Sequence, residues 1–441
     1  MRVDLVNKFG AQIIPFAIGV GFLLSISTNL RFSVFPVGLG ELLLAVLAVV
    51  GLGAARFKLL CTTPVVVFWL MALTGMAFGV LVQDRIEPVG IRHSMAYLFT
   101  AGVTVGISGL LLNLEDAALR RSILWLSVIT AALLWFGFVV YLVGDSALMQ
   151  RLLLVDSSDL RFSGWSTNPN QLALFFVPLP VWVAALWRDV SSPTRWQMAG
   201  FGLLLLALML MGLLVRSDGL FVVWVFEFVI LIMLRLRWEM KASRMSLLGY
   251  AMVMVLCVFL VKTFAHGEVR KSVRCAAETI TQGEGLWSAK CYDGQAFQDQ
   301  EAFRIGYSNP LEKTGVRKEL WVRGLQAWQT SPWFGLGPGE HSWYSIDLNE
   351  TKSEPMESHN ITIDMLTQGG ILTGGAWLVL VSYLLIGAWR IRDSYTFSVV
   401  LMMAAFTFFH NTRQPYFWFV LAMSYEAIRR KLFVSQTNDK A

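Results

Sequence analysis

Four short polar segments, separated by long apolar runs, carry residues whose chemistry suits a diphosphate ester. They hold Arg161, Arg216 and Arg317, and the last of them places His359 beside Asn360. Guanidinium groups bind phosphate oxygens two at a time and keep their charge. A histidine at a helix start is held toward its neutral form by the helix dipole, so it can accept a proton. Together these groups suit glycosyl transfer, in which a diphosphate leaving group gains negative charge and an acceptor hydroxyl loses a proton.

Each segment also has a purely structural explanation. Asn168 and Pro169 suit the cap and first turn of a helix, and Arg216 could reach from the end of a span to the membrane surface. His359 could be a hydrogen-bonded surface histidine, and the glycines in 335–339 could form only a turn. These explanations do not account for the gathering of all four segments on one predicted side of a membrane.

No metal ion and no cofactor are expected. The external segments have no cluster of Asp and Glu that would hold Mg²⁺, and no Cys and His spacing resembles a zinc site. Arginines that bind the diphosphate would neutralise the charge that a metal ion otherwise neutralises.

The elements that position these segments are predicted to be membrane-spanning helices. The chain has 441 residues, of which 56% are hydrophobic and 15% are charged, whereas a soluble domain has about a quarter charged residues. Its apolar stretches are long enough to cross a bilayer and do not alternate as barrel strands do, so the expected fold is an all-α polytopic membrane protein. About twelve spans are predicted, at 11–29, 37–54, 64–82, 94–113, 123–144, 170–187, 198–215, 219–235, 246–263, 361–389, 396–411 and 415–428.

The positions of lysine and arginine predict the orientation of these spans. Of those in short segments, 18 fall on one side and 7 on the other. Both termini are therefore expected in the cytoplasm, with the chain a polytopic protein of the inner-membrane type and the polar segments on the external face. The stretch from Met1 to Ser27 could imitate a signal peptide, but it lacks a clear cleavage site and is predicted to be the first span. The net charge of +6 needs no nucleic-acid partner.

Three parts are expected along the chain. A membrane bundle covers 1–263, a large periplasmic loop covers 264–358, and a second bundle with a short cytoplasmic tail covers 359–441. Within the loop, a tryptophan-rich helix is predicted from Gly315 to Thr330. Cys275 and Cys291 also lie there, where an oxidising exterior would permit a disulfide between them; two free thiols are the alternative.

Three ordered segments resemble the O-antigen ligase and O-antigen polymerase superfamily. The segment 161–173 (RFSGWSTNPNQLA) resembles the family's Arg…Gly…Asn-Pro-Asn segment at the start of a span. The segment 315–339 resembles its loop pattern of Arg, Trp and then Pro…Gly-x-Gly-x-Gly, and 359–374 resembles its His-Asn motif followed by glycine. The order, the spacing, the large external loop and the predicted topology all agree with this family.

Two positions depart from the family pattern. The family often has Ser-Arg-Gly after the seventh span, whereas this chain has Arg216-Ser217-Asp218-Gly219, which weakens the assignment of Arg216. The second glycine after His-Asn falls at Gly374 instead of at 373, which affects only the expected helix packing.

The resemblance implies a metal-independent membrane glycosyltransferase that takes a glycan from an undecaprenyl diphosphate carrier on the periplasmic face. Arg161 and Arg317 would bind the diphosphate or the donor sugar, and Arg216 and Asn170 are further candidates for this role.

The resemblance also implies which residues would handle the proton. His359 would be the general base or would position the acceptor, and Asn360 would orient it. Glu357, two residues away, is a competing base.

The resemblance leaves the acceptor open. A polymerase would add repeat units of O-antigen, capsule or exopolysaccharide to another lipid-linked glycan, and a ligase would transfer the chain to lipid A-core. The Asn-Pro-Asn-Gln-Leu-Ala sequence is slightly more typical of polymerases, so polymerisation is favoured, with a chain-length regulator as a further conceivable partner.

The alternative from another functional class is a flippase or transporter of lipid-linked polysaccharide. Such a protein would use ionisable residues inside the membrane, for which Glu227 and Asp364 are the candidates. No inverted repeat is visible, and the polar segments gather at one face instead of midway across the membrane, so the enzyme is favoured.

Overall fold

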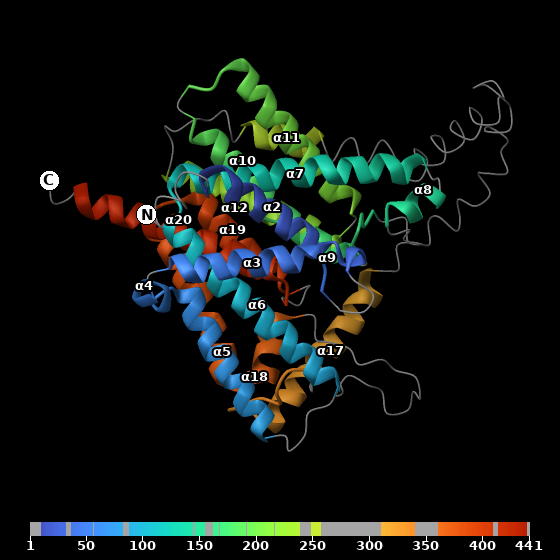
Figure 1. Cartoon of the computed structure of the whole chain (residues 1–441), viewed down its shortest axis with the longest axis vertical. Helices are drawn as coiled ribbons and strands as arrows, with labels where there is room; N and C mark the ends of the chain where they lie inside the picture. The colour runs from blue at the N-terminus through green and yellow to red at the C-terminus, as the bar shows by residue number, and fades with distance from the viewer. Residues whose placement is uncertain are drawn as a thin grey trace.

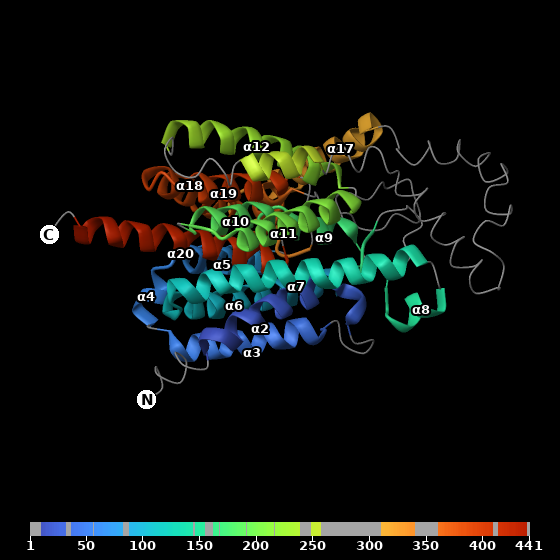
Figure 2. The same cartoon turned by 90° about the horizontal axis from the view of Figure 1, so that it is seen from above.

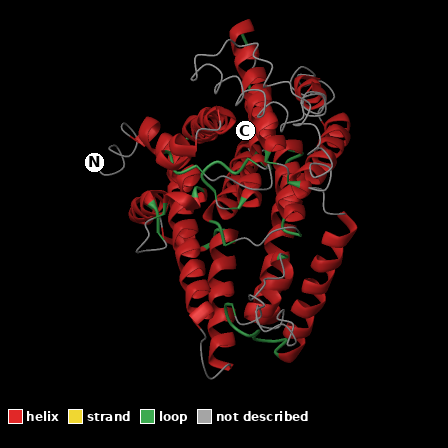
Figure 3. Cartoon of the chain, turned by 90° about the vertical axis from the view of Figure 1, so that its right-hand side faces the viewer, coloured by secondary structure: helices red, strands yellow, loops and turns green. Residues whose placement is uncertain are grey.

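The structure is a computed structural model of the chain. It describes residues 10–31, 37–55, 57–82, 88–143, 146–154, 162–166, 168–190, 192–215, 217–238, 248–256, 310–339, 360–408 and 413–438. In these residues all regular elements are helical (Figure 3), and the only β-type pairing is one isolated bridge between Arg31 and Gly38. The predicted all-α class is confirmed.

The helices that correspond to predicted spans match most of the predicted bounds to within a few residues. They are α2 (Gly10–Ile26), α3 (Leu39–Ala54), α5 (Pro64–Val82), α6 (Pro88–Asn113), α7 (Asp116–Val143), α9 (Pro169–Phe176), α10 (Leu179–Arg188), α11 (Arg195–Leu214), α12 (Asp218–Trp238), α18 (Ile361–Arg390), α19 (Ser394–Phe406) and α20 (Pro415–Asn438). The largest differences are at α6 and α7, which begin six and seven residues earlier than predicted, and at α20, which ends ten residues later. Residues 248–256, within another predicted span, are also helical. The helix predicted in the large loop is present as α17 (Pro310–Thr330) and begins before the predicted Gly315.

Short elements that the hydrophobic pattern did not predict connect some of the spans. They are α4 (Phe57–Cys61), α8 (Ser146–Arg151) and the 3-10 helix η1 (Thr28–Leu30).

The membrane character is confirmed, whereas the count of twelve spans stays a prediction. By length and composition, seven helices among the described residues could cross a membrane, and three shorter apolar helices accompany them. One of the seven, Pro169–Arg188, consists of α9 and α10. These two helices meet at Pro178, which has no backbone N–H to continue a helical ladder.

The helices lie side by side in a bundle with two ends (Figures 1 and 2). α4 and the last turns of α20 lie at the left of Figure 2, whereas α8, α9 and α17 lie toward its right. Following the predicted orientation, we call the first the inner end and the second the outer end. The main packing pairs are α3 with α6, α5 with α18, α2 with α7, α2 with α3, and α12 with α19.

An aromatic cluster packs helices from both halves of the sequence together. Trp418 of α20 stacks on Phe68 of α5, with ring centroids 4.7 Å apart, and meets the ring of Trp69 edge-on at the same distance. Trp377 of α18 lies 5.9 Å from Trp418, and all four side chains are buried. Because aromatic rings bury a large area and pack in a few preferred geometries, this cluster fixes α5, α18 and α20 relative to one another.

At the inner end, a buried carboxylate joins three helices. Asp393, between α18 and α19, accepts hydrogen bonds from Lys431 of α20 and from Thr396, and it lies 3.4 Å from Nη1 of Arg188 on α10. Burial raises the pKa of this carboxyl, but the charges of Lys431 and Arg188 and the hydrogen bonds outweigh burial and lower the pKa from 3.8 to about 2.

Acid should therefore destabilise the fold through Asp393. Because the pKa is lower in the folded chain, the stabilisation is present above about pH 4 and is lost as the pH falls toward about 2. We expect Asp393→Asn to lower the free energy of unfolding at neutral pH by on the order of 2 kcal/mol. In thermal unfolding of the detergent-solubilised protein, the variant should lose less stability than the wild type over that acid range. Parallel acid dependence of the two proteins would contradict this role.

Candidate active site

A glycine-rich loop at the outer end enters a break in α18. The glycine loop, residues 332–339, follows α17 closely. Three backbone hydrogen bonds join it to α18: Leu336 N to Thr367 O (2.6 Å), Gly337 N to Gln368 O (3.0 Å) and Ile371 N to Pro332 O (2.9 Å). At Gly369 and Gly370 the backbone of α18 leaves helical dihedral angles. The loop therefore satisfies backbone groups that the interrupted helix could not pair within itself.

Glycine is required at this junction because three backbones meet without room for side chains. Gly370 has a φ of +65°, and a Cβ there would lie 2.1 Å from the carbonyl oxygen of Trp333. Gly335 has a φ of +71°, and its Cβ would lie 2.5 Å from the carbonyl carbon of Gln368. From α5, a Cβ on Gly79 would lie 2.5 Å from the amide nitrogen of Gly337. The glycines that the sequence analysis could explain as a turn therefore form a packing junction of α5, α18 and the glycine loop.

Thr373 shows how this chain accommodates a threonine where the resembled family has glycine. Its buried hydroxyl donates to the carbonyl of Gly369 at 3.2 Å and lies 3.5 Å from that of Ala72 on α5. The departure from the family pattern thus adds a hydrogen bond beside the break. It affects the packing of α5 against α18.

Asn360 fixes the start of α18. Its Oδ1 accepts hydrogen bonds from the backbone N–H groups of Thr362 (3.0 Å) and Ile363 (3.3 Å), which have no partner within the helix. The next residue, Ile361, donates its N–H to the carbonyl of Thr407 at the end of α19 (3.2 Å). Asn360 is only 4% exposed, so the helix start is buried and held by a second helix.

Several of the predicted site residues lie outside the described residues. They are Arg161, Arg216, Cys275, Cys291, Glu357 and His359. For His359, the structure gives the position of the next residue, Asn360, at the buried start of α18. The disulfide and the catalytic roles stay predictions.

The two short segments that carry Arg161 and Arg216 have neighbouring residues in contact. Phe162 donates its backbone N–H to the carbonyl of Leu214, with N and O 3.2 Å apart. Phe162 follows Arg161 directly, and Leu214 precedes Arg216 by two residues. The structure thus brings together the described ends of two segments that are about fifty residues apart in the sequence.

Asn168 and Pro169 begin α9, as the sequence predicts. Oδ1 of Asn168 accepts a hydrogen bond from the N–H of Asn170 at 2.9 Å, and Pro169 occupies the first turn. Asn170 is half-buried in the same turn. The start of α9 is thus a capped helix end, and Asn170 stays a candidate for substrate binding.

Arg317 lies on α17, although its side chain is outside the described part of the chain. α17 packs on α18, and the ring of Trp321 lies 6.4 Å from that of Phe408 just beyond α19. Nε1 of Trp328 donates to the carbonyl of Pro332 at 3.0 Å. α17, the glycine loop, the break in α18 and the end of α19 are therefore one connected packing unit at the outer end.

Three glutamines near this end of the bundle were not among the predicted site residues. Each has a buried side-chain oxygen, Oε1, with no hydrogen-bond partner among the described residues. They are Gln171 on α9, Gln368 on α18 and Gln414 before α20. A buried amide oxygen normally has a protein, water or ligand partner. Their only sequence signal is a polar residue beside a span start or a tandem glycine. Among the described residues, no group of three or more His, Cys, Asp and Glu side chains gathers as a metal site would require.

One family model matches a part of the chain that contains the glycine loop and the break in α18. Residues 201–378 match the family described as O-antigen ligase. The match runs from α11 to the middle of α18 and includes Arg216, Arg317, the glycine loop and His359, whereas Arg161 and Asn170 precede it. A search of curated proteins gives no match.

The junction predicts different outcomes for two glycines on α18. Gly370→Ala should lower the free energy of unfolding by on the order of 2 kcal/mol or more, because it puts a side chain at positive φ against a backbone carbonyl. Gly375→Ala is the matched control, since a Cβ at Gly375 meets nothing within 4 Å. Thermal unfolding in detergent measures both. Equal midpoints for the two variants would show that the glycine loop does not depend on the break.

Proposed function

We propose that this chain, whose residues 201–378 match the O-antigen ligase family, transfers a glycan from an undecaprenyl diphosphate carrier to a sugar hydroxyl at the outer end. The family match supports a glycosyltransferase of this general type in a bacterial membrane. The observation that carries the proposal is the packing unit at the outer end. It holds α17, the glycine loop and the start of α18 together, and so fixes the chain positions next to the proposed base and diphosphate ligand.

The proposed reaction forms one bond and breaks one bond at the anomeric carbon of the donor sugar. The acceptor oxygen attacks that carbon while its proton passes to His359, or to the competing base Glu357. The bond from the anomeric carbon to the diphosphate oxygen breaks, and its electron pair leaves with undecaprenyl diphosphate. A base within hydrogen-bond reach and with a pKa near neutrality is suited to this step.

Arginines would neutralise the charge of the leaving diphosphate. Arg161 and Arg317 are proposed as its main ligands and Arg216 as a further one, because guanidinium groups can pair with two phosphate oxygens at once. The contact between Phe162 and Leu214 supports a joint role, since these residues lie within two positions of Arg161 and Arg216.

The cap of α18 limits what Asn360 can do in this reaction. Its Oδ1 already accepts two backbone hydrogen bonds, so Nδ2 is the end of the amide that would donate to His359 or to the substrate. Near the start of α9, Asn170 is proposed to bind a sugar hydroxyl, and Gln171 offers a buried carbonyl oxygen for the same purpose.

Polymerisation of polysaccharide repeat units is the favoured form of the reaction, with transfer to lipid A-core as the alternative. The support for this choice is the Asn-Pro-Asn-Gln-Leu-Ala sequence at the start of α9. Both forms break the same sugar–diphosphate bond, so the acceptor alone distinguishes them.

One buried residue favours a second candidate function, lipid transport. Glu227 on α12 is fully buried, and neither carboxylate oxygen has a hydrogen-bond partner among the described residues. An intramembrane carboxyl is often part of a transport pathway. Tyr250 is close enough to interact with it electrostatically.

The test uses purified wild type and His359→Ala with a lipid-diphosphate-linked oligosaccharide and no added metal. Released undecaprenyl diphosphate and glycan size are measured, alone and with lipid A-core present. We expect release with growing chains from the wild type and a loss of about 10²- to 10⁴-fold in His359→Ala, as for removal of a general base. His410→Ala, in the segment between α19 and α20, is the control and should retain activity.

The remaining outcomes separate the alternatives. Release only in the presence of lipid A-core would assign the ligase reaction. No release with either acceptor, together with movement of the lipid across vesicle membranes that Glu227→Gln abolishes, would replace the enzyme by a flippase.

A further inference from the structure

A charged cavity of about 170 Å³ lies at the inner end of the bundle. The start of α7, the end of α10, the start of α19 and the inner part of α20 enclose it. None of the proposed transfer residues lines it, and the glycine loop belongs to the other end of the bundle. The cavity is therefore separate from the proposed site of glycosyl transfer.

Cationic groups outnumber carboxylates in the cavity lining by one. The cations are Arg120, Arg188, Arg430 and Lys431, and the carboxylates are Asp116, Asp189 and Asp393. Behind the lining, Glu426 pairs with both Arg429 and Arg430, which adds one charge of each sign, so a ligand with a single negative charge would balance the whole group. Because an uncompensated charge in a partly buried site is unfavourable, the lining favours a monoanion such as a phosphodiester.

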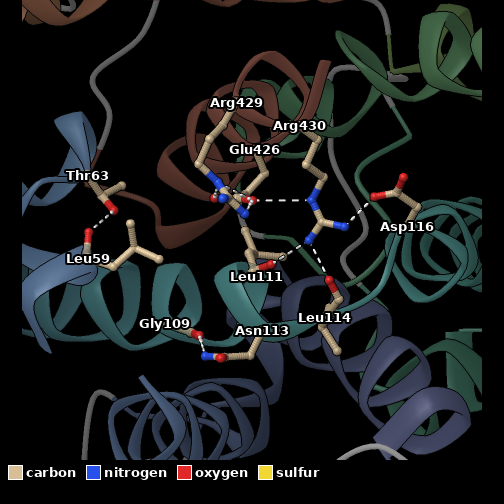
Figure 4. A network of polar contacts seen from close by, with 10 residues as sticks. All are labelled: Leu59, Thr63, Gly109, Leu111, Asn113, Leu114, Asp116, Glu426, Arg429 and Arg430. Atoms are coloured by element: carbon tan, nitrogen blue, oxygen red, sulfur yellow. Dashed lines mark hydrogen bonds and ion pairs between the residues drawn. The ribbon is translucent and has the colours of Figure 1, made fainter. Parts of the chain in front are cut away.

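Two of the four cations are fixed parts of the cavity wall. Arg188 lies 2.9 Å from an oxygen of Asp189 and 3.4 Å from one of Asp393. Arg430 pairs with Glu426 and Asp116 and also donates to backbone carbonyls where α6 leads into α7 (Figure 4). These contacts hold α7, α10 and α20 around the cavity.

The other two cations retain donors for a ligand. The side chains of Arg120 and Lys431 are 53% and 45% exposed. Arg120 is 3.7 Å from Asp189, which is too far for a hydrogen bond. Lys431 uses one of its three N–H donors on Asp393 within the described part of the chain. Both can therefore bind phosphate oxygens without breaking the wall.

The apolar part of the lining continues onto the membrane face of α7. Leu119 and Ile123 line the cavity beside Arg120. Arg120, Leu124 and Val128 follow one another at intervals of four residues, so they lie along one side of the helix. Leu124 and Val128 are 39% and 37% exposed. This line of side chains leads from the charged mouth into the apolar surface of the bundle.

We propose that this cavity binds the phosphodiester headgroup of an anionic phospholipid, with an acyl chain along Leu124 and Val128. Basic pockets between membrane helices at the cytoplasmic surface suit such headgroups. A zwitterionic lipid would bring an ammonium group toward the cations, and inorganic phosphate has no apolar part to contact α7. The bound lipid would stabilise the junction of α7, α10, α19 and α20.

The test measures thermal unfolding of the full chain, purified in nonionic detergent and depleted of lipid. Phosphatidylglycerol, phosphatidylcholine and inorganic phosphate are titrated separately. We expect phosphatidylglycerol alone to raise the midpoint in a saturable way, as a ligand that binds only the folded state does. In the double variant Arg120→Gln, Lys431→Gln, the apparent affinity for phosphatidylglycerol should be at least tenfold weaker.

The matched control removes two charges from the same end of the bundle without touching the cavity. Arg195→Gln, Arg390→Gln does this, since both residues are exposed and neither lines the cavity. This control should bind phosphatidylglycerol as the wild type does. Equal weakening in both double variants would overturn the proposal by showing only general attraction to an anionic surface. If inorganic phosphate raised the unfolding midpoint as much as phosphatidylglycerol does, the ligand would be free phosphate instead of a lipid. If no ligand raised the midpoint, the cavity would not be a binding site.

Discussion

The arrangement of the outer end depends on the insertion of the glycine loop into the break of α18. A span interrupted inside a membrane would leave backbone N–H and C=O groups unpaired, at a cost of several kcal/mol each. Here the N–H of Ile371 pairs with the carbonyl of Pro332, and two N–H groups of the loop pair with carbonyls of α18. The break and the loop therefore require each other. The backbones of α5, α18 and the glycine loop can approach this closely only because residues 79, 335 and 370 are glycine.

This constraint connects the proposed chemistry to the bundle. α17, which carries Arg317, ends just before the glycine loop, and the first half of α18 begins at Asn360 next to His359. Because the loop pairs with α18 three turns or less from its start, a shift of the loop would move both the proposed diphosphate ligand and the proposed base. The aromatic cluster around Trp418 then holds α18 against α5 and α20, which limits such a shift.

The sequence predicted those features that depend on local pattern. Long apolar runs predicted most of the helices, and Asn168 with Pro169 predicted the start of α9, because hydrophobic length and helix capping are local properties. The insertion of the loop was not predicted, since it pairs residues about thirty positions apart, and a Gly-x-Gly pattern has no partner until the chain is folded. The tandem Gly369-Gly370 in an apolar span was its only local signal. Likewise, the contact of Phe162 with Leu214 depends on tertiary packing, which residue spacing in the sequence does not predict.

His359 and the diphosphate-binding arginines are proposed to converge at one site, and cross-linking of cysteine pairs measures whether they do. The four native cysteines are first replaced by serine, and cysteine pairs are then introduced at 161 and 359 and at 317 and 359. Each pair is treated with a bifunctional thiol reagent about 10 Å long. This length is about the largest separation at which a base could still reach the reacting group after small movements. A pair at 359 and 431 joins opposite ends of the bundle and is the control. We expect efficient cross-links in the first two pairs and none in the control. If both thiols of the first two pairs react with a monofunctional reagent but do not cross-link, the base and the diphosphate ligands are not at the same site and the proposed mechanism is wrong.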